Sequence, residues 1–230
     1  ALICLIVAFF ILYHVFRLLR ALLASKGHFR AWYQRKQLAK AHSKTSAGLL
    51  ALDAADYKSA ERLLLQGVDS SPSPLVNYLA AARAAMFQQN AENCERHLKQ
   101  AAKIAKSSAD QKAYLLTEAD LSLKLHNLAS AENSLTAFSK LDDKHPRYLA
   151  LCSKLYETNE QWQKGFDLLP RLKRRKVFDE VALNALEHRL AEKLLTTLTD
   201  DKARQAVWKK LSKTAQKDTH LQQLHLSASP

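Results

Sequence analysis

Four short stretches decide the fold: DYKSAE at residues 56–61, AENCE at 91–95, LASAE at 128–132 and QWQKG at 161–165. When the stretches are aligned on one small residue each, the matching positions are Ala60, Cys94, Ala131 and Gly165. These positions lie 34, 37 and 34 residues apart. A recurrence at this period indicates repeated helix–turn–helix units, each of which packs on the next to bury a shared core.

Two further positions recur in the same register. Twelve residues before each aligned position, another small residue occurs: Gly48, Ala82, Ala119 and Ser153. Four residues after it, one helical turn along the same face, the residues are Leu64, Leu98, Leu135 and Leu169. Small side chains on both partners allow two helices to approach closely. The pattern therefore predicts four tetratricopeptide-type hairpins over residues 41–176, with a generic antiparallel bundle as the alternative.

The composition favours an all-α fold. The chain has only 4 glycines and 5 prolines, too few for the many turns of an all-β protein, and it is rich in good helix formers. We expect the hairpins to form a right-handed superhelical array whose concave face is lined by the first helix of each pair. Residues 177–230 are predicted to form a further helical pair. We expect this pair to be truncated, because no polar-faced capping helix is evident at the end.

The chain opens with an apolar run over residues 1–16 (ALICLIVAFFILYHVF), and apolar residues continue to Ala24. A membrane-spanning helix needs about 20 such residues, so we predict a transmembrane helix over residues 1–24. A secretory signal peptide is the alternative, but its basic residues precede the apolar run, whereas here they follow it. Because the first residue is alanine, we expect the natural start to lie upstream.

Basic residues follow the apolar run, and residues 25–44 predict a basic juxtamembrane helix or linker. Eight Lys or Arg residues lie between positions 17 and 44, and the first acidic residue of the chain is Asp53. The positive-inside rule places such a flank, and the repeats after it, in the cytoplasm. Anionic lipid is the expected partner of the flank. The residues expected at the membrane surface are Arg17, Arg20, Arg30, Trp32, Tyr33, Arg35 and Lys36.

The net charge of +13 also raises the possibility of nucleic-acid binding. Eight of these charges belong to the flank beside the apolar run, and no nucleic-acid-binding module accompanies them. Nucleic acid is therefore not expected as a partner.

The sequence shows no evident catalytic chemistry. Its glycines form neither a phosphate loop nor a dinucleotide-binding turn. The cysteines lack metal-ligand spacing, and Cys94 and Cys152 are interpreted as buried core thiols. The histidines interpreted as members of solvated helix faces are His97, His126, His145 and His188. We therefore expect no enzyme, no metal site and no resident cofactor, although contact of one histidine with heme or a porphyrin stays open.

Several stretches together resemble the HemY family of proteobacterial inner-membrane proteins. They are the apolar anchor, the aromatic–basic stretch at 29–36 (FRAWYQRK) and the hairpin around Gly48 and 56–57 (DY). Residues 74–81 (PLVNYLAA), and the segment from 144–146 (KHP) through Trp162 to 167–170 (DLLP), resemble later parts of that family. The resemblance implies a role in late protoheme IX biosynthesis without a known catalytic site, with membrane-associated heme-synthesis enzymes as partners. A flavin-dependent protoporphyrinogen oxidase shares the name but needs a glycine-rich turn that this chain lacks.

Three functional hypotheses follow. The first is a non-catalytic scaffold that binds heme-synthesis enzymes through its concave groove. By repeat register, the groove residues are Leu49, Leu52, Arg83, Met86, Asp120, Lys124, Lys154 and Glu157. The second is a porphyrin or heme carrier or chaperone, motivated by His28, Trp32 and Tyr33. The third is an adaptor for another envelope process, such as lipopolysaccharide control, because the fold carries no chemistry of its own.

Overall fold

The computed structural model describes residues 2–226, with the side chains of all of these except residues 2–8, 11 and 18–31. Every regular element in this described part is a helix, which confirms the all-α prediction. The chain divides into two compact units, Ala1–Ile104 and Ala105–Pro230.

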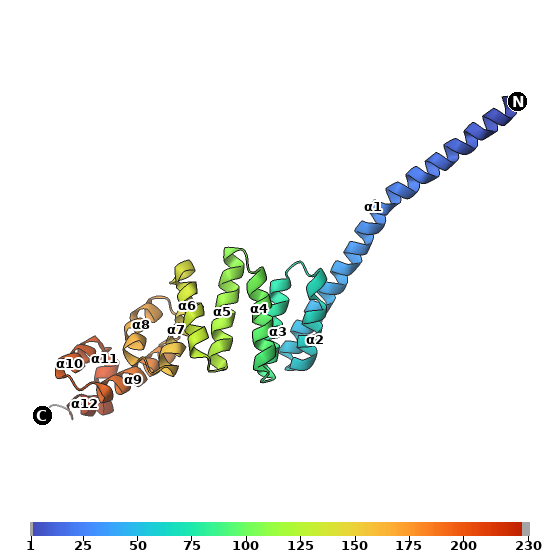
Figure 1. Ribbon diagram of the computed structural model, residues 1–230. Coiled ribbons are helices and arrows are strands. Elements are labelled where there is room, and N and C mark those ends of the chain that lie inside the picture. Colours follow the sequence, from blue (N-terminus) through green and yellow to red (C-terminus); the bar gives the residue numbers. More distant parts are fainter. Residues whose placement is uncertain (1, 227–230) are drawn as a thin grey trace. The chain divides into compact units, whose positions relative to one another are not determined.

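The first unit combines one long helix with shorter helices that pack beside its C-terminal part (Figure 1). Its elements are α1 (Leu2–Asp53), α2 (Tyr57–Gln66), the 3-10 helix η1 (Val68–Ser70), α3 (Pro74–Phe87) and α4 (Ala91–Ile104). Helix α1 packs on α2, α2 on α3, and α3 on α4. The buried amide of Asn77 donates to the hydroxyl of Thr45 and to the carbonyl of Leu64, both at 2.8 Å, and so joins α3 to α1 and α2.

The second unit contains the remaining helices. They are α5 (Ser108–Lys124), α6 (Leu128–Asp142), α7 (Pro146–Thr158), α8 (Trp162–Arg174), α9 (Glu180–Thr197), α10 (Asp201–Lys210), α11 (Lys213–Gln216) and α12 (Thr219–Leu226). Helix α5 packs on α6, α7 on α8, and α8 on α9. After α9, where one more helix was expected, the chain forms three short ones. The breaks occur where Ser212 and Asp218 each accept a backbone N–H three residues ahead and start a new helix.

The second helix of successive pairs begins with the same local chemistry. The side chains of Asp56, Asn90 and Asn127 each accept the backbone N–H three residues ahead, at 3.2, 2.9 and 3.2 Å. These bonds satisfy donors that the first turn of a helix leaves unpaired. Hydrogen bonds from Ser59 lower the pKa of Asp56. Pro146 occupies the first turn of α7, where its missing N–H costs nothing.

The first helices of the pairs end in a recurring left-handed turn. Among the described residues, positive φ occurs at Ala55, Gln89, His126 and Glu160, which follow the first helices of the pairs, and at Lys176, which follows α8; none of them is glycine. The next residue in each case donates its N–H to a carbonyl five positions back, for example Asn90 to Ala85 at 2.9 Å. This is the hydrogen bond of a Schellman turn, which normally uses glycine. The turns at positions 55, 89, 126 and 160 keep the repeat spacing of the aligned small residues.

The small residues lie at helix contacts, as the spacing predicts. Ala60, Cys94, Ala131 and Gly165 are all buried. A Cβ added at Gly48 would lie 2.7 Å from Cγ of Leu64 on the facing helix. One added at Gly165 would lie 3.0 Å from Leu190. The contact at Gly48 also involves the backbone N of Leu64 at 3.0 Å, so close helix approach requires glycine there, whereas at Gly165 a small shift of the Leu190 methyl group would make room for a Cβ.

The membrane prediction concerns the N-terminal part of α1. Among the residues whose side chains are described, no helix was found that is both long enough and apolar enough to cross a membrane. Most of the transmembrane helix predicted over residues 1–24 lies outside those residues. The basic stretch at residues 25–44 is helical throughout and belongs to α1.

Candidate functional site

The second unit contains a groove between α7 and α9. Its volume is about 470 Å³. The α7 residues that line it are Arg147, Ala150, Leu151, Ser153, Lys154 and Glu157. From α9 and the loop before it, the lining residues are Phe178, Ala182, Ala185, Leu186 and Arg189. We refer to this feature as the α7–α9 groove.

Small residues on both helices leave space for the groove. Ala150 on α7 and the pair Ala182 and Ala185 on α9 keep the space between the two helices open. Large apolar residues of α7, including Leu149 and Leu155, are buried in the core instead. The amphipathic pattern of α7 therefore leaves one face to build the core and another to line the groove.

Charged side chains form the rim of the groove. Glu157 accepts two hydrogen bonds from the guanidinium of Arg189, at 3.0 and 3.1 Å, which link α7 to α9. Arg147 lies 3.6 Å from Asp120, and Lys124 lies 3.4 Å from the same carboxylate. The groove lining itself carries three cations, Arg147, Lys154 and Arg189, but one carboxylate. Its rim is therefore electropositive.

The eight residues predicted for the concave groove fall in both units. Lys154 and Glu157 line the α7–α9 groove, and Asp120 and Lys124 belong to the ion pairs at its edge. In the first unit the remaining four lie on α1 and α3: Leu49, Leu52, Arg83 and Met86. Leu49 is exposed, whereas Leu52 is partly buried and packs against the core of that unit. Arg147, Phe178 and Arg189 were not predicted; the last two lie beyond Lys176, where the repeat register weakens.

A second hollow of about 570 Å³ lies between α8, α9 and the end of α10. Two pairs of its polar groups bond to each other. Lys210 lies 3.5 Å from Asp167, and Glu187 accepts the backbone N–H of Ser212 at 2.8 Å. These internal bonds make it a weaker candidate for binding a charged partner than the α7–α9 groove.

The residues expected at a membrane surface lie on α1. Trp32 and Tyr33 are 54% and 53% exposed, and the ammonium of Lys36 lies 5.1 Å from the centre of the Trp32 ring. Arg17 and Arg35 are exposed as well, whereas the side chains of Arg20, His28 and Arg30 lie outside those described. Toward the N-terminus, exposed apolar side chains gather on the same helix: Phe9, Phe10, Leu12, Tyr13, Val15 and Phe16.

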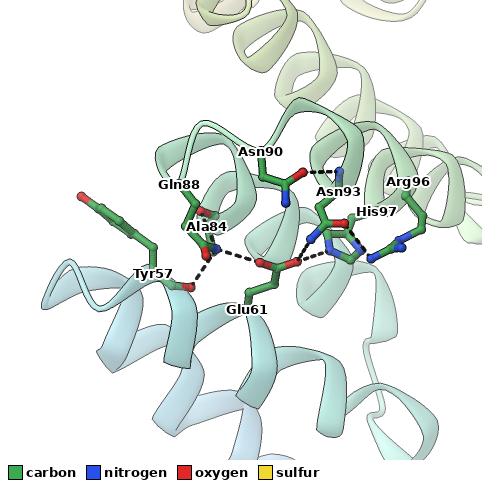
Figure 2. A network of polar contacts seen from close by, with 8 residues as sticks. All are labelled: Tyr57, Glu61, Ala84, Gln88, Asn90, Asn93, Arg96 and His97. Carbon is green, nitrogen blue, oxygen red and sulfur yellow. Dashed lines mark hydrogen bonds and ion pairs between the residues drawn. The ribbon is translucent and has the colours of Figure 1, made fainter.

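A buried polar network links α2, α3 and α4 in the first unit (Figure 2). The carboxylate of Glu61 faces Nε2 of His97 at 2.8 Å and accepts the amide N–H groups of Asn93 and Gln88, at 3.0 and 2.7 Å. The side chains of His97 and Glu61 are only 4% and 13% exposed. The interpretation of His97 as a solvated residue is therefore wrong, because Glu61 on a neighbouring helix gives the buried ring a partner.

Comparisons with known proteins agree with the resemblance. Residues 1–89 match the family model described as the HemY protein N-terminus. Protein HemY of Escherichia coli strain K12 is 27% identical over 223 residues, which cover 96% of this chain and 56% of that protein. The same values hold for Protein HemY of Shigella flexneri.

This chain is similar to the HemY proteins over nearly its whole length.

The HemY match divides the chain unevenly. The segment that matches the N-terminal HemY model ends just after α3, so the α7–α9 groove lies beyond it. Over its whole length, the chain spans about half of the curated HemY relatives that it matches. No solved structure matches the chain at a significant level. The two described cysteines are buried, as the sequence pattern predicts: burial raises the pKa of the Cys94 thiol to about 11 and also raises that of Cys152, as expected for inert core thiols.

Proposed function

We propose that this HemY relative is a non-catalytic, membrane-associated scaffold that binds an acidic, partly apolar segment of a partner protein in the α7–α9 groove. In this proposal the partners are membrane-associated enzymes of late protoheme IX biosynthesis. The observation that carries the proposal is the groove itself, with its apolar floor and its excess of cations.

The floor and rim of the groove favour this class of partner. Phe178, Ala182 and Ala185 offer accessible apolar surface, and burying such surface drives most protein association. Arg147 and Lys154 add positive charge beside it, which selects an acidic segment and repels a basic one. A helix or extended segment with apolar residues beside Asp or Glu would satisfy both parts, in the manner of other groove-bound peptides.

Two further observations support the membrane and heme parts of the proposal. The relatives are HemY proteins of bacteria. The exposed apolar side chains of α1, followed by Trp32, Tyr33 and cations, suit an attachment to anionic lipid with the repeats on the cytoplasmic side. Confining successive enzymes at one patch of membrane raises the local concentration of a reactive intermediate without new catalytic groups.

The decisive experiment combines crosslinking with porphyrin analysis in cells that lack the gene. The complementing protein carries a photo-crosslinking amino acid at Ala185 in the groove, and captured proteins are identified by mass spectrometry. We expect heme-synthesis enzymes among them. The double variant Arg147→Glu, Lys154→Glu should lower their yield about tenfold, equivalent to about 1.4 kcal/mol of binding, and should cause late porphyrins to accumulate.

A matched control separates the groove from charge in general. The double variant Lys140→Glu on α6 and Arg174→Glu on α8 changes the charge by the same amount at exposed positions outside the groove lining. It should leave capture and porphyrins unchanged. If the groove variant captures partners as well as this control does, the groove is not the binding site. A normal porphyrin profile in cells without the gene would remove heme synthesis from the proposal while leaving the scaffold.

A further inference from the structure

The fold brings together three potential metal ligands that are scattered in the sequence. His188 lies on α9, and Asp218 and His220 lie at the start of α12. One ligand atom from each lies within 4.8 Å of the others. Nε2 of His188 is already 3.4 Å from Oδ2 of Asp218, and the His188 and His220 rings are nearly parallel, with 16° between their planes.

We propose that His188, Asp218 and His220 form a binding site for a divalent transition metal ion, with Zn²⁺ as the best-suited ion. Zinc takes imidazole nitrogen and carboxylate oxygen as ligands at about 2.0–2.2 Å, commonly in tetrahedral geometry with three protein ligands and water. Ligand atoms in such a site lie about 3.4 Å apart. The His188–Asp218 separation has this value, so a shift of the exposed His220 ring by at most about 1.4 Å (4.8 − 3.4 Å) would complete the set.

The surrounding contacts orient the carboxylate for this role. Oδ1 of Asp218 accepts the backbone N–H of Leu221 at 3.0 Å, which leaves Oδ2 directed at His188. Leu221 is fully buried, and α12 packs on α9 through it, so the two elements that supply the ligands are held together without the ion. Hydrogen bonds that fix ligand orientation in this way are a common feature of metal sites.

A bound ion would tie α12 to α9. This role is independent of the α7–α9 groove and of heme synthesis. The ligands that suit it, two imidazoles and a carboxylate, favour zinc, nickel or copper over magnesium or calcium, which prefer all-oxygen sites.

The test titrates the purified chain with ZnCl₂ by calorimetry and follows Co²⁺ as a spectroscopic probe of coordination. We expect saturable binding of one ion at this site, a visible spectrum of low-coordinate Co²⁺, and slower hydrogen–deuterium exchange in α12. His220→Ala, at an exposed position that leaves the fold intact, should weaken binding at least about 10- to 100-fold.

Two more variants test whether binding depends on these ligands. Asp218→Asn retains a side chain that caps α12 but removes the charge, and it should also weaken binding. His42→Ala removes an exposed histidine of α1 and should change nothing at this site. Absence of saturable Zn²⁺ binding, or equal binding by the chain and by His220→Ala, would overturn the proposal.

Discussion

The cores of the two units differ in the size and polarity of their buried side chains. The core cluster of the first unit consists mainly of small side chains, Ala60, Ala80, Ala81 and Ala84 with Leu64, beside the Glu61 network. The core of the second unit contains many large side chains, among them Phe138, Leu149, Leu172 and Leu190. A helix pair can therefore be stabilised in two ways: by close approach of the two helices with buried hydrogen bonds between them, or by burial of a larger apolar area.

One buried thiol in each unit provides a separate probe of its stability. Cys94 is fully buried in the first unit, and Cys152 is 3% exposed in the second. Because burial raises the pKa of both thiols, neither should react with an alkylating agent at neutral pH until its unit opens. In a Cys4→Ser background, labelling rates at the two cysteines therefore report the opening of each unit.

Leu190→Ala should have the largest effect, because it removes a fully buried side chain from the apolar core of the second unit. We expect the free energy of unfolding to fall by about 3 kcal/mol. Labelling of Cys152 should accelerate by about a hundredfold, whereas labelling of Cys94 should not. Val181→Ala, at an exposed position of the same helix, is the control and should have little effect. Equal acceleration at both cysteines would show that the units open together.

Ala81→Leu tests whether small side chains allow the helices of the first unit to approach closely. Ala81 is fully buried in an alanine-rich cluster, so three added carbon atoms have no space. We expect a loss of about 1–3 kcal/mol from overpacking, measured by faster labelling of Cys94. Ala102→Leu on the exposed face of α4 is the matched control. If Ala81→Leu is neutral, the small side chains do not set the helix separation.

His97→Ala tests whether the buried polar network around Glu61 stabilises the first unit. Removal of the imidazole deprives the nearly buried Glu61 carboxylate of one donor while Asn93 and Gln88 remain. We expect the first unit to lose about 1–2 kcal/mol, seen at Cys94. Lys99→Ala removes an exposed ion pair with Glu95 and should cost well under about 1 kcal/mol. An effect of His97→Ala no larger than that of Lys99→Ala would contradict a structural role for the network.

Glu160→Gly should have the smallest effect and the opposite sign. Glu160 adopts a φ of 52°, which costs a side-chain-bearing residue about 1–2 kcal/mol, whereas glycine adopts it freely. Part of this gain is offset by the greater freedom of glycine in the unfolded chain, so we expect a stabilisation of roughly 0.5–1 kcal/mol. The gain is measured as a rise in the urea concentration at which half of the second unit is unfolded, followed by labelling of Cys152. A destabilisation would show that the Glu160 side chain contributes contacts that outweigh the backbone strain.

Sequence reasoning was most accurate for packing along the repeat. The recurrence of Ala60, Cys94, Ala131 and Gly165 placed four buried small residues, and both Cys94 and Cys152 were expected in the core. Helical periodicity carries this information because each face of a helix repeats every three to four residues. His97 was misplaced because its partner Glu61 lies on another helix, at a distance in sequence that no local pattern reveals.

By itself, the sequence determined an all-helical chain, the period of its repeats and the small residues at which helices meet, because these follow from local propensity and side-chain volume. Only the tertiary structure decided the left-handed turns at five non-glycine residues, the Glu61–His97 network and the meeting of His188 with Asp218 and His220. It also decided that Arg147, Lys154 and Arg189 share one groove. The physical reason is that polar partners on different helices are selected by the register and crossing of those helices, which depend on the packing of the whole unit.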